Sequence, residues 1–377
     1  MSGIARRSAP IRALVVDDSM LMRAMIRDAL QAEGDITCIG SAKDTVEARR
    51  MIKVLNPDVL TLDVEMPGMN GIDFLEKIMT LRPMPVVMVS SLTESGTDTT
   101  LAALGTGAVD AVAKPAGKTG PDFANNLRHA VRTAACANIR KHRPAAPAAQ
   151  VTAKKLPPAP AQNFARRLIA IGASTGGVSA IAQFLRGLQP PLPPMVITQH
   201  MPPDYTQRFA KRLDGEFAFD IAEARHGEVL TNNMIRIAPG DRHLKIALSG
   251  GAIITQLSDD DPVSGHRPSV DTLLGSIPAE LSAKAIGIML TGMGRDGANG
   301  LLEMRKAGAI TFGQSEASCV VYGMPRAARA KGAVMHELDI DQLASQVMQA
   351  ARNSPKPMQT NPRPNGAASR HIPPQIG

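Results

Sequence analysis

The stretch LIAIGASTGGVSAIAQFLRGL, residues 168–188, decides the fold. It opens with a short apolar run, continues through a glycine-containing turn, and ends with apolar residues at helical spacing. A strand that leads through a tight turn into a helix is typical of α/β folds with parallel sheets. Because the sites of such folds lie at the carboxyl ends of strands, we expect this turn to belong to a functional site.

Short apolar runs alternate with segments of helical period along the rest of the chain. In the second half they are LIAIG at Leu168, MVITQ at Met195, MIRIAPG at Met234 and AIGIMLTG at Ala285; in the first half they are ALVV at Ala13, DVLTL at Asp58, PVVMVS at Pro85 and AVDAVA at Ala108. This rhythm predicts βαβ units. We therefore expect an α/β fold in both halves, each doubly wound around a mainly parallel sheet.

Two segments without apolar periodicity divide and end the chain. RPAAPAAQVTAKKLPPAPAQ, residues 143–162, is rich in Pro and Ala, and the last residues are rich in Pro and Asn. Such segments cannot offset their ordering entropy by burial, and 377 residues exceed what one core organises. We expect one domain over residues 11–137, a basic linker over 138–165, a second domain over 166–351, and a disordered tail over 352–377.

The formal net charge of +8 is unevenly placed. Residues 138–167 and 352–377 hold many Lys and Arg and no acid, so the remainder of the chain is slightly acidic. A surface for nucleic acid needs clustered basic residues in the folded part. We therefore expect no nucleic-acid partner.

Cysteine usage and hydropathy indicate the compartment. Cys38, Cys136 and Cys319 form no CxxC pair, which argues against a disulfide framework and a structural zinc site. The first residues, MSGIARRSAP, contain no apolar run, and no stretch approaches the roughly 18 apolar residues of a membrane span. We expect a cytoplasmic protein with no signal peptide and no membrane insertion.

Three carboxylates follow predicted strands of the first half. Asp17 and Asp18 come directly after ALVV, and Asp63 comes directly after DVLTL. Such crowding needs a cation, and a hard divalent ion such as Mg²⁺ prefers oxygen ligands. We predict a Mg²⁺ site in which Asp63 is the nucleophile. Ser90 and Lys114 end two further strands, where a hydroxyl and an ammonium group suit phosphoryl oxygens.

Taken singly, each of these residues is as well explained by a turn or a helix cap. Together, DD, the D of TLDVEMPGMNG, the S of VMVSS and the K of AKP resemble the receiver domain of bacterial two-component response regulators. The resemblance implies a flavodoxin-like, five-stranded parallel sheet and Mg²⁺-dependent phosphoryl transfer from a sensor histidine kinase to Asp63. Ala111 stands where many receivers carry an aromatic switch residue, which leaves the signal relay open.

Ser174 lies in the turn of GASTGG, at the start of a predicted helix. Free N–H groups at a helix N-terminus stabilise negative charge nearby, whether on an oxyanion or on a phosphate. The turn therefore fits three interpretations: a plain strand-to-helix connection, a phosphate-binding loop, or a nucleophile turn of the pattern G-x-S-x-G.

His200 and Asp296 favour the nucleophile interpretation. His200 follows the strand MVITQ, and Asp296 lies in TGMGRDG after the strand that begins at Ala285. A serine hydroxyl needs a base of pKa near 7, and the imidazole needs an acceptor that fixes its tautomer. Alone, His200 is equally a surface histidine and Asp296 a turn carboxylate. The order Ser, His, Asp disfavours the α/β-hydrolases.

The words IGASTGG, QHMP and LTGMGRDG, with their spacing, resemble the catalytic domain of the chemotaxis protein-glutamate methylesterases. Further matching words are RIAPGDRHL, HRPSVD and FGQSEASCVVYGMP. The resemblance implies removal of methyl groups from glutamate γ-methyl esters on methyl-accepting chemoreceptors, and deamidation of receptor glutamines, without a cofactor in this domain. It implies Ser174 as nucleophile, His200 as base, Asp296 as the group that orients the imidazole, and backbone at Met293 near the oxyanion.

The fused receiver implies control by phosphorylation, with a chemotaxis histidine kinase as phosphodonor. In this family the unphosphorylated receiver covers the catalytic cleft. Two alternatives stay open. One is a non-catalytic response regulator whose second domain binds protein or nucleic acid. The other is a hydrolase that acts on a different ester, which the same three residues would serve equally well.

Overall fold

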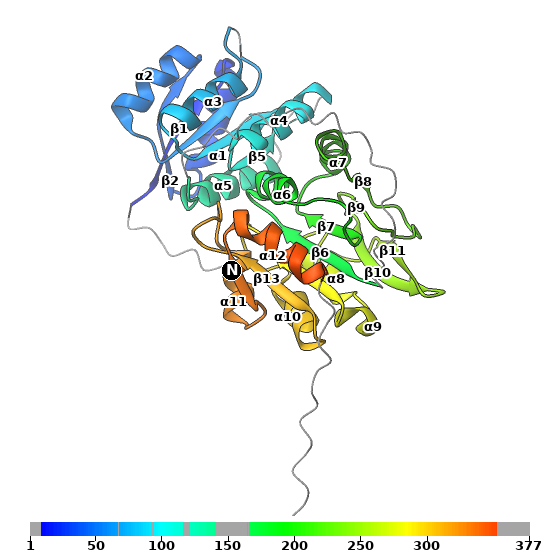
Figure 1. Cartoon of the computed structure of the whole chain (residues 1–377). Coiled ribbons are helices and arrows are strands. Elements are labelled where there is room, and N and C mark those ends of the chain that lie inside the picture. Colours follow the sequence, from blue (N-terminus) through cyan, green and yellow to red (C-terminus); the bar gives the residue numbers. More distant parts are fainter. Residues whose placement is uncertain are drawn as a thin grey trace, which may run out of the picture.

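The computed structural model describes residues 9–66, 68–91, 94–115, 121–139, 164 and 166–352, which form two α/β domains (Figure 1). Nearly all of the predicted linker, and the predicted tail beyond residue 352, lie outside the described residues. In the described part of the chain, no helix is both long and apolar enough to cross a membrane.

The N-terminal domain is a five-stranded parallel sheet covered by helices on both faces. Its elements are β1 (Ile11–Val16), α1 (Met20–Gln31), β2 (Ile36–Ala42), α2 (Thr45–Leu55), β3 (Val59–Asp63), α3 (Gly71–Leu81), β4 (Val86–Ser90), α4 (Glu94–Thr106), β5 (Asp110–Ala113) and α5 (Pro121–Ala135). The strand order β2-β1-β3-β4-β5 is the flavodoxin-like order. The predicted fold of this domain is confirmed.

The alternation of side chains along the strands explains the two covered faces. In β1, Leu14 and Val16 pack into one hydrophobic core, and Ala13 and Val15 pack into the core on the opposite face. Strands buried on both faces read as continuous apolar runs, which is how the sequence presents them. After each run a helix begins, and polar side chains cap some of these helices at the N-terminus. Ser19 caps α1 by accepting a hydrogen bond from Met22 N.

The C-terminal domain has a seven-stranded sheet in which every pair is parallel. Its elements are β6 (Leu168–Ala173), α6 (Gly177–Arg186), β7 (Met195–Gln199), α7 (Tyr205–Glu216), β8 (Asp220–Glu223), β9 (Met234–Ile237), β10 (His243–Ser249), β11 (Ala252–Ser258), α8 (Val270–Gly275), α9 (Ala279–Ser282), β12 (Ala285–Met289), α10 (Ala298–Lys306), β13 (Ile310–Gln314), α11 (Met324–Ala330), β14 (His336–Leu338) and α12 (Ile340–Arg352). The four predicted strands are β6, β7, β9 and β12. The antiparallel pair β10–β11 was not predicted.

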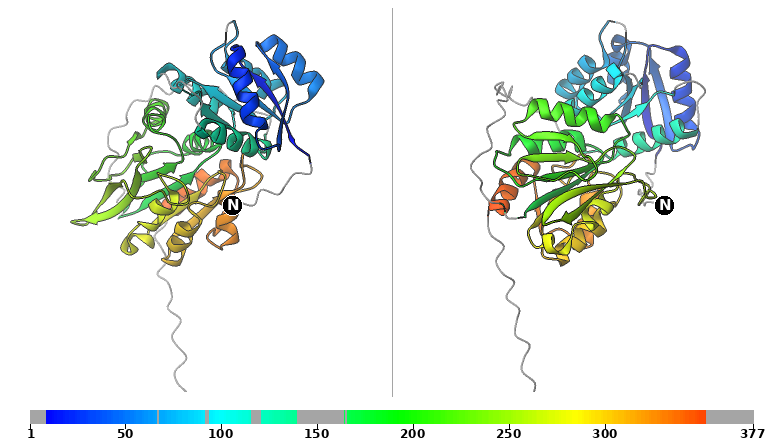
Figure 2. Two further views of the ribbon diagram at one scale, coloured as in Figure 1. Left: turned by 180° about the vertical axis from the view of Figure 1, so that it is seen from behind. Right: turned by 90° about the vertical axis from the view of Figure 1, so that its right-hand side faces the viewer.

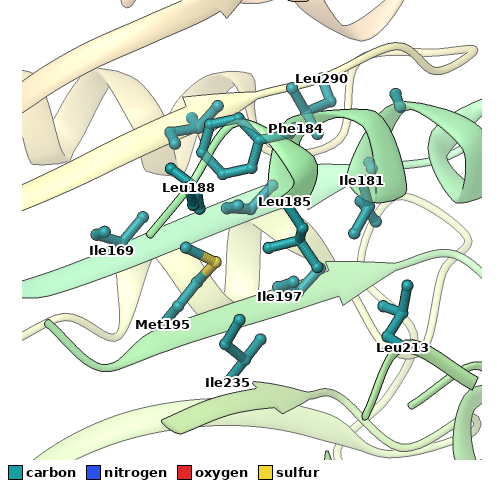
Figure 3. Packing of buried hydrophobic residues seen from close by; sticks show 14 of the residues in the cluster. Ile169, Ile181, Phe184, Leu185, Leu188, Met195, Ile197, Leu213, Ile235 and Leu290 are labelled. Carbon is teal, nitrogen blue, oxygen red and sulfur yellow. The ribbon is translucent and has the colours of Figure 1, made fainter. Parts of the chain in front are cut away.

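The strand order β14-β13-β12-β6-β7-β9-β8 reverses direction at β6. From β6 the chain proceeds to β7 on one side and returns later to β12 on the other. In open α/β sheets, ligands bind at the carboxyl ends of strands where the order reverses. Figure 3 shows the core below this edge, where Phe184 and Leu185 of α6 pack over Ile169, Met195 and Ile197.

The two domains contact each other mainly through α4, which lies beside α6 and α7 (Figures 1 and 2). Leu101 of α4 is buried in the core of the C-terminal domain. Its carbonyl accepts a hydrogen bond from Arg212 Nη1 at 2.6 Å, and Asp98 pairs with Arg208 at 3.1 Å. A further backbone hydrogen bond of 2.8 Å joins Asn138 N to Val320 O. One helix of the N-terminal domain thus carries both apolar and polar contacts between the domains.

Candidate functional site

Ser174 is the first residue after β6. Its N–H donates to Thr291 O at 3.0 Å, which ties it to the loop that follows the adjacent strand β12. Gly176 follows with φ of 76°, a left-handed conformation that favours glycine, and helix α6 begins at Gly177. A Cβ at Gly176 would lie 2.6 Å from the Cβ of Val320, so the turn also needs a residue without a side chain. The strand-turn-helix geometry predicted for Ser174 is present.

His200 is the first residue after β7 and lies beside Ser174 in the sheet. In the ladder between β6 and β7, Ala173 pairs with Gln199, so each of the two residues is one step beyond a paired position. His200 Nε2 and Asp296 Oδ2 are 2.8 Å apart. His200 Nδ1 is buried and has no hydrogen-bond partner in the described part of the chain. A neutral imidazole that donates from Nε2 to Asp296 leaves Nδ1 as its proton acceptor.

Asp296 is held by four donors. Besides His200, its carboxylate accepts from Ser269 Oγ at 2.8 Å, Val270 N at 2.7 Å and Asp271 N at 3.1 Å. Burial acts to raise the pKa of Asp296, but the hydrogen bond and charge of His200 and the two N–H groups outweigh it, so the pKa is lowered. Asp296 therefore stays ionised and fixed in orientation.

Ser269 belongs to the word HRPSVD, and sequence reasoning gave it no role. Its N–H donates to His243 Nδ1 at 3.2 Å, and His243 is buried. The sequence words that contain Ser269 and His243 thus gain a structural role. Ser269 donates a hydrogen bond to Asp296, and His243 holds Ser269 in place. No sequence spacing links these residues, since His243 begins the hairpin β10–β11 and Ser269 follows that hairpin.

His266, also in HRPSVD, stacks on His200. The ring centroids are 3.7 Å apart and the planes differ by 10°. Burial, and then the neighbouring His200, lower the pKa of His266 to about 4, so its ring is neutral near pH 7. In the sequence, His266 is only one residue of the word HRPSVD, and a stack between distant loops has no sequence signature.

A cavity of about 970 Å³ lies between the two domains at this edge. The C-terminal domain contributes Ser174, His200, Met293 and Asp296, and the N-terminal domain contributes Asp110, Ala111 and His129 among others. Burial raises the pKa of Asp110 to about 6, partly opposed by its hydrogen bond from Ala111 N. In the described residues no hydrogen bond joins Ser174 to His200, but both face this cavity.

Met293 lies in the loop after β12. Neither its N–H nor those of Thr175 and Gly176 donate a hydrogen bond within the described residues, so all three are available to a ligand. The N–H of Ser174 is not available, because it donates to Thr291 O.

The second cluster lies at the carboxyl edge of the N-terminal sheet. Ligand atoms of Asp17, Asp18 and Asp63 lie within 4.8 Å of one another. Lys114 Nζ is 3.0 Å from Asp17 Oδ2 and 2.7 Å from Asp63 Oδ2. Burial raises the pKa of Asp63 to about 6; Asp17 adds to this shift and Lys114 opposes it. Because all the donors are carboxylate oxygens, the cluster fits a Mg²⁺ ion.

Ser90 belongs to β4, the strand between β3 and β5, but its hydroxyl is bonded to another side chain. It ends β4, and its hydroxyl lies 2.7 Å from Thr100 Oγ1 on α4. The structure thus brings together four of the five residues predicted for the rim, with the Ser90 hydroxyl turned to α4.

Comparison with known proteins assigns a family model to each of the two domains. The family model described as CheB methylesterase matches residues 169–347, and that of the response regulator receiver domain matches residues 13–120. A protein of Caulobacter vibrioides named protein-glutamate methylesterase/protein-glutamine glutaminase 1 is 51% identical over 347 residues, which cover 91% of this chain and 98% of that protein. One of Dechloromonas aromatica with the same name is 47% identical and covers 90% and 98%.

Two solved structures from Thermotoga maritima also match, each over one part of the chain. The CheB methylesterase catalytic domain is 32% identical with a TM-score of 0.47, and covers 48% of this chain and 97% of its own. The response regulator domain of CheB is 44% identical with a TM-score of 0.32, and covers 34% and 98%.

Proposed function

Because this chain belongs to the CheB methylesterase family, we propose that it is a phosphorylation-activated protein-glutamate methylesterase and protein-glutamine glutaminase of chemotaxis. Its substrates are glutamate γ-methyl esters and glutamines of methyl-accepting chemoreceptors, and its phosphodonor is a chemotaxis histidine kinase. It acts in the cytoplasm. A non-catalytic second domain is not favoured, because its relatives are named as enzymes.

The observation that carries the proposal is the hydrogen bond of 2.8 Å between His200 and Asp296 beside Ser174. Ser174 Oγ attacks the ester carbonyl while His200 Nδ1 takes its proton. The tetrahedral intermediate collapses as the imidazolium returns the proton to the leaving methanol, or to ammonia from a glutamine. Water, deprotonated by His200, then hydrolyses the acyl-enzyme and restores Ser174. Asp296 keeps its charge throughout and stabilises the imidazolium.

The oxyanion needs donors that the protein does not already use. The N–H of Met293 meets this condition, as do those of Thr175 and Gly176 at the start of α6. We assign the oxyanion to this set, with Met293 as the member from the loop after β12.

In the receiver domain, Asp63 accepts the phosphoryl group. A Mg²⁺ ion held by Asp17, Asp18 and Asp63 would neutralise the carboxylates and the incoming phosphoryl oxygens. Lys114 supplies a fixed ammonium group beside Asp63, and Ser90 a hydroxyl for a phosphoryl oxygen.

Control follows from the shared cavity. Receiver residues line the same space as Ser174, so a docked receiver limits the access of a receptor helix. Phosphorylation shifts the population towards undocked receivers, which needs only about a few kcal/mol. Residues 11–137 form the receiver, 138–165 the linker, 166–351 the catalytic domain and 352–377 a tail.

The test is release of methanol from methylated chemoreceptor fragments, with and without a small phosphodonor and Mg²⁺. We expect release that the donor stimulates, that Ser174→Ala abolishes, and that Asp63→Ala leaves unstimulated. A chain that begins near Asn163 should be active without the donor. No release by the wild type under any condition would assign the chain to a different ester, and an inert truncated chain would reject inhibition by the receiver.

A further inference from the structure

The side chain of Gln199 joins the backbone of Ser174 to that of His200. Its Nε2 donates to Ser174 O at 3.0 Å and to His200 O at 3.1 Å. Gln199 is the last residue of β7 and is 3% exposed. Both amide hydrogens are thus used on the two residues proposed as nucleophile and base.

The Gln199 amide lies just beyond the paired part of the sheet, where strand pairing no longer fixes the distance between Ser174 and His200. The ladder between β6 and β7 ends at the pair Ala173–Gln199, followed by one hydrogen bond from His200 N to Ala173 O. In the described residues no direct hydrogen bond joins Ser174 to His200. The Gln199 amide is therefore what connects the two loops beyond the last paired position.

The amide oxygen of Gln199 has no role of its own in the fold. An apolar side chain of the same length would fill this space at a smaller cost in folding free energy. Gln199 Oε1 is buried without a hydrogen-bond partner in the described part of the chain. It also occupies the space beside Gly177, where a Cβ would be 1.9 Å away. An unpaired buried oxygen destabilises the fold, so we attribute the amide to its two donated hydrogen bonds. We propose that Gln199 is a positioning residue that sets the reach between Ser174 and His200.

The test uses the full-length protein with phosphodonor and Mg²⁺. Gln199→Met keeps the length of the side chain and removes both donors. Because small misplacements at a reacting centre are costly, we expect kcat for methanol release to fall about 10- to 100-fold with KM nearly unchanged. Labelling of Ser174 by a small fluorophosphonate should slow in parallel. Thr198→Val is the matched control, since Thr198 precedes Gln199 and is fully buried, and its hydroxyl has no hydrogen-bond partner among the residues that the structure describes.

A purely structural role would lower the thermal unfolding midpoint and leave kcat per folded molecule unchanged. That result, or full labelling of Ser174 in Gln199→Met, would overturn the proposal. Gln199→Glu guards against failure to fold. When protonated, its carboxyl group can donate one of the two bonds, so its activity relative to wild type should rise as the pH is lowered, and a constant ratio would contradict the proposal.

Discussion

The two sites of this protein lie at equivalent edges of two parallel sheets, yet their electrostatics are opposite. In the catalytic domain, four donors surround Asp296, and against the effect of burial those of His200, Val270 and Asp271 lower its pKa. In the receiver, Asp63 lies beside Asp17, and burial raises its pKa to about 6. The donors around Asp296 outweigh the effect of its burial, whereas Lys114 beside Asp63 does not.

This difference indicates where control acts. The hydrogen bond between His200 and Asp296 is already formed while the receiver is docked, so activation does not need to assemble it. The receiver instead lines the cavity that a substrate must enter, through residues such as Asp110 and His129. We therefore expect phosphorylation to change the receiver site and, at the catalytic site, only the access of the substrate.

The largest effect should come from removing the charge that orients His200. In Asp296→Asn the amide cannot accept from all of its present donors and favours the wrong imidazole tautomer. We expect kcat to fall about 10⁴-fold, measured as methanol release with the donor present. Asp271→Asn is the control, because the Asp271 carboxylate accepts from Gly300 N and does not contact His200. Equal losses in the two variants would contradict the assignment.

The next effect concerns the receiver alone. Asp63→Ala should bring the ratio of donor-stimulated to basal methanol release to about one, while basal release stays within about twofold of wild type. Asp73→Ala, on the exposed side of α3, should keep its stimulation. Stimulation that survives in Asp63→Ala would place the phosphoacceptor elsewhere.

A smaller effect should follow removal of the stacked ring. His266→Ala leaves one face of His200 without its partner, and a stacking contact of about 1 kcal/mol corresponds to a roughly fivefold lower kcat. His266→Phe, which restores a flat ring, should recover most of this loss. Unchanged kcat in His266→Ala would show that the stack does not orient His200.

The smallest effect should be a pH dependence of docking. Asp110 lines the cavity between the domains, and burial raises its pKa to about 6 from its ordinary value of 3.8, so we expect protonation to favour docking and ionisation above pH 6 to oppose it. The basal activity divided by that of Asp110→Asn should therefore fall as the pH is lowered through 6, and this ratio cancels the effects of pH that the two proteins share.

At pH 7, Asp110→Asn should dock more firmly and show several-fold lower basal activity. Asp98→Asn, which breaks the ion pair with Arg208, should change basal activity in the opposite direction. Higher basal activity in Asp110→Asn would contradict this sign.

The sequence predicted those site residues whose place depends only on their position at the end of a strand. Ser174, His200 and Asp63 each follow an apolar run, and parallel strands bring such positions to one edge. Both sheets and the four strands expected in the C-terminal half follow from the same periodicity. The sheet order of the receiver followed from its resemblance to a family.

What the sequence did not predict depends on contacts between distant loops. Gln199 reads as the end of a strand, and its amide gains a role only because β6 lies beside β7. His266 and Ser269 reach the site through a loop that follows an unpredicted hairpin. Leu101 reads as a residue of its own domain's core, since nothing in one helix shows which of its apolar faces another domain covers.

The most direct test of the central claim, that the catalytic site is assembled and only its access is controlled, compares two reactions of the full-length protein. A small fluorophosphonate that fits the cavity should label Ser174 at nearly the same rate with and without phosphodonor and Mg²⁺. Methanol release from methylated receptor fragments should rise many-fold with the donor. Labelling that rises in step with methanol release would contradict the claim, because it would mean that phosphorylation assembles the site itself.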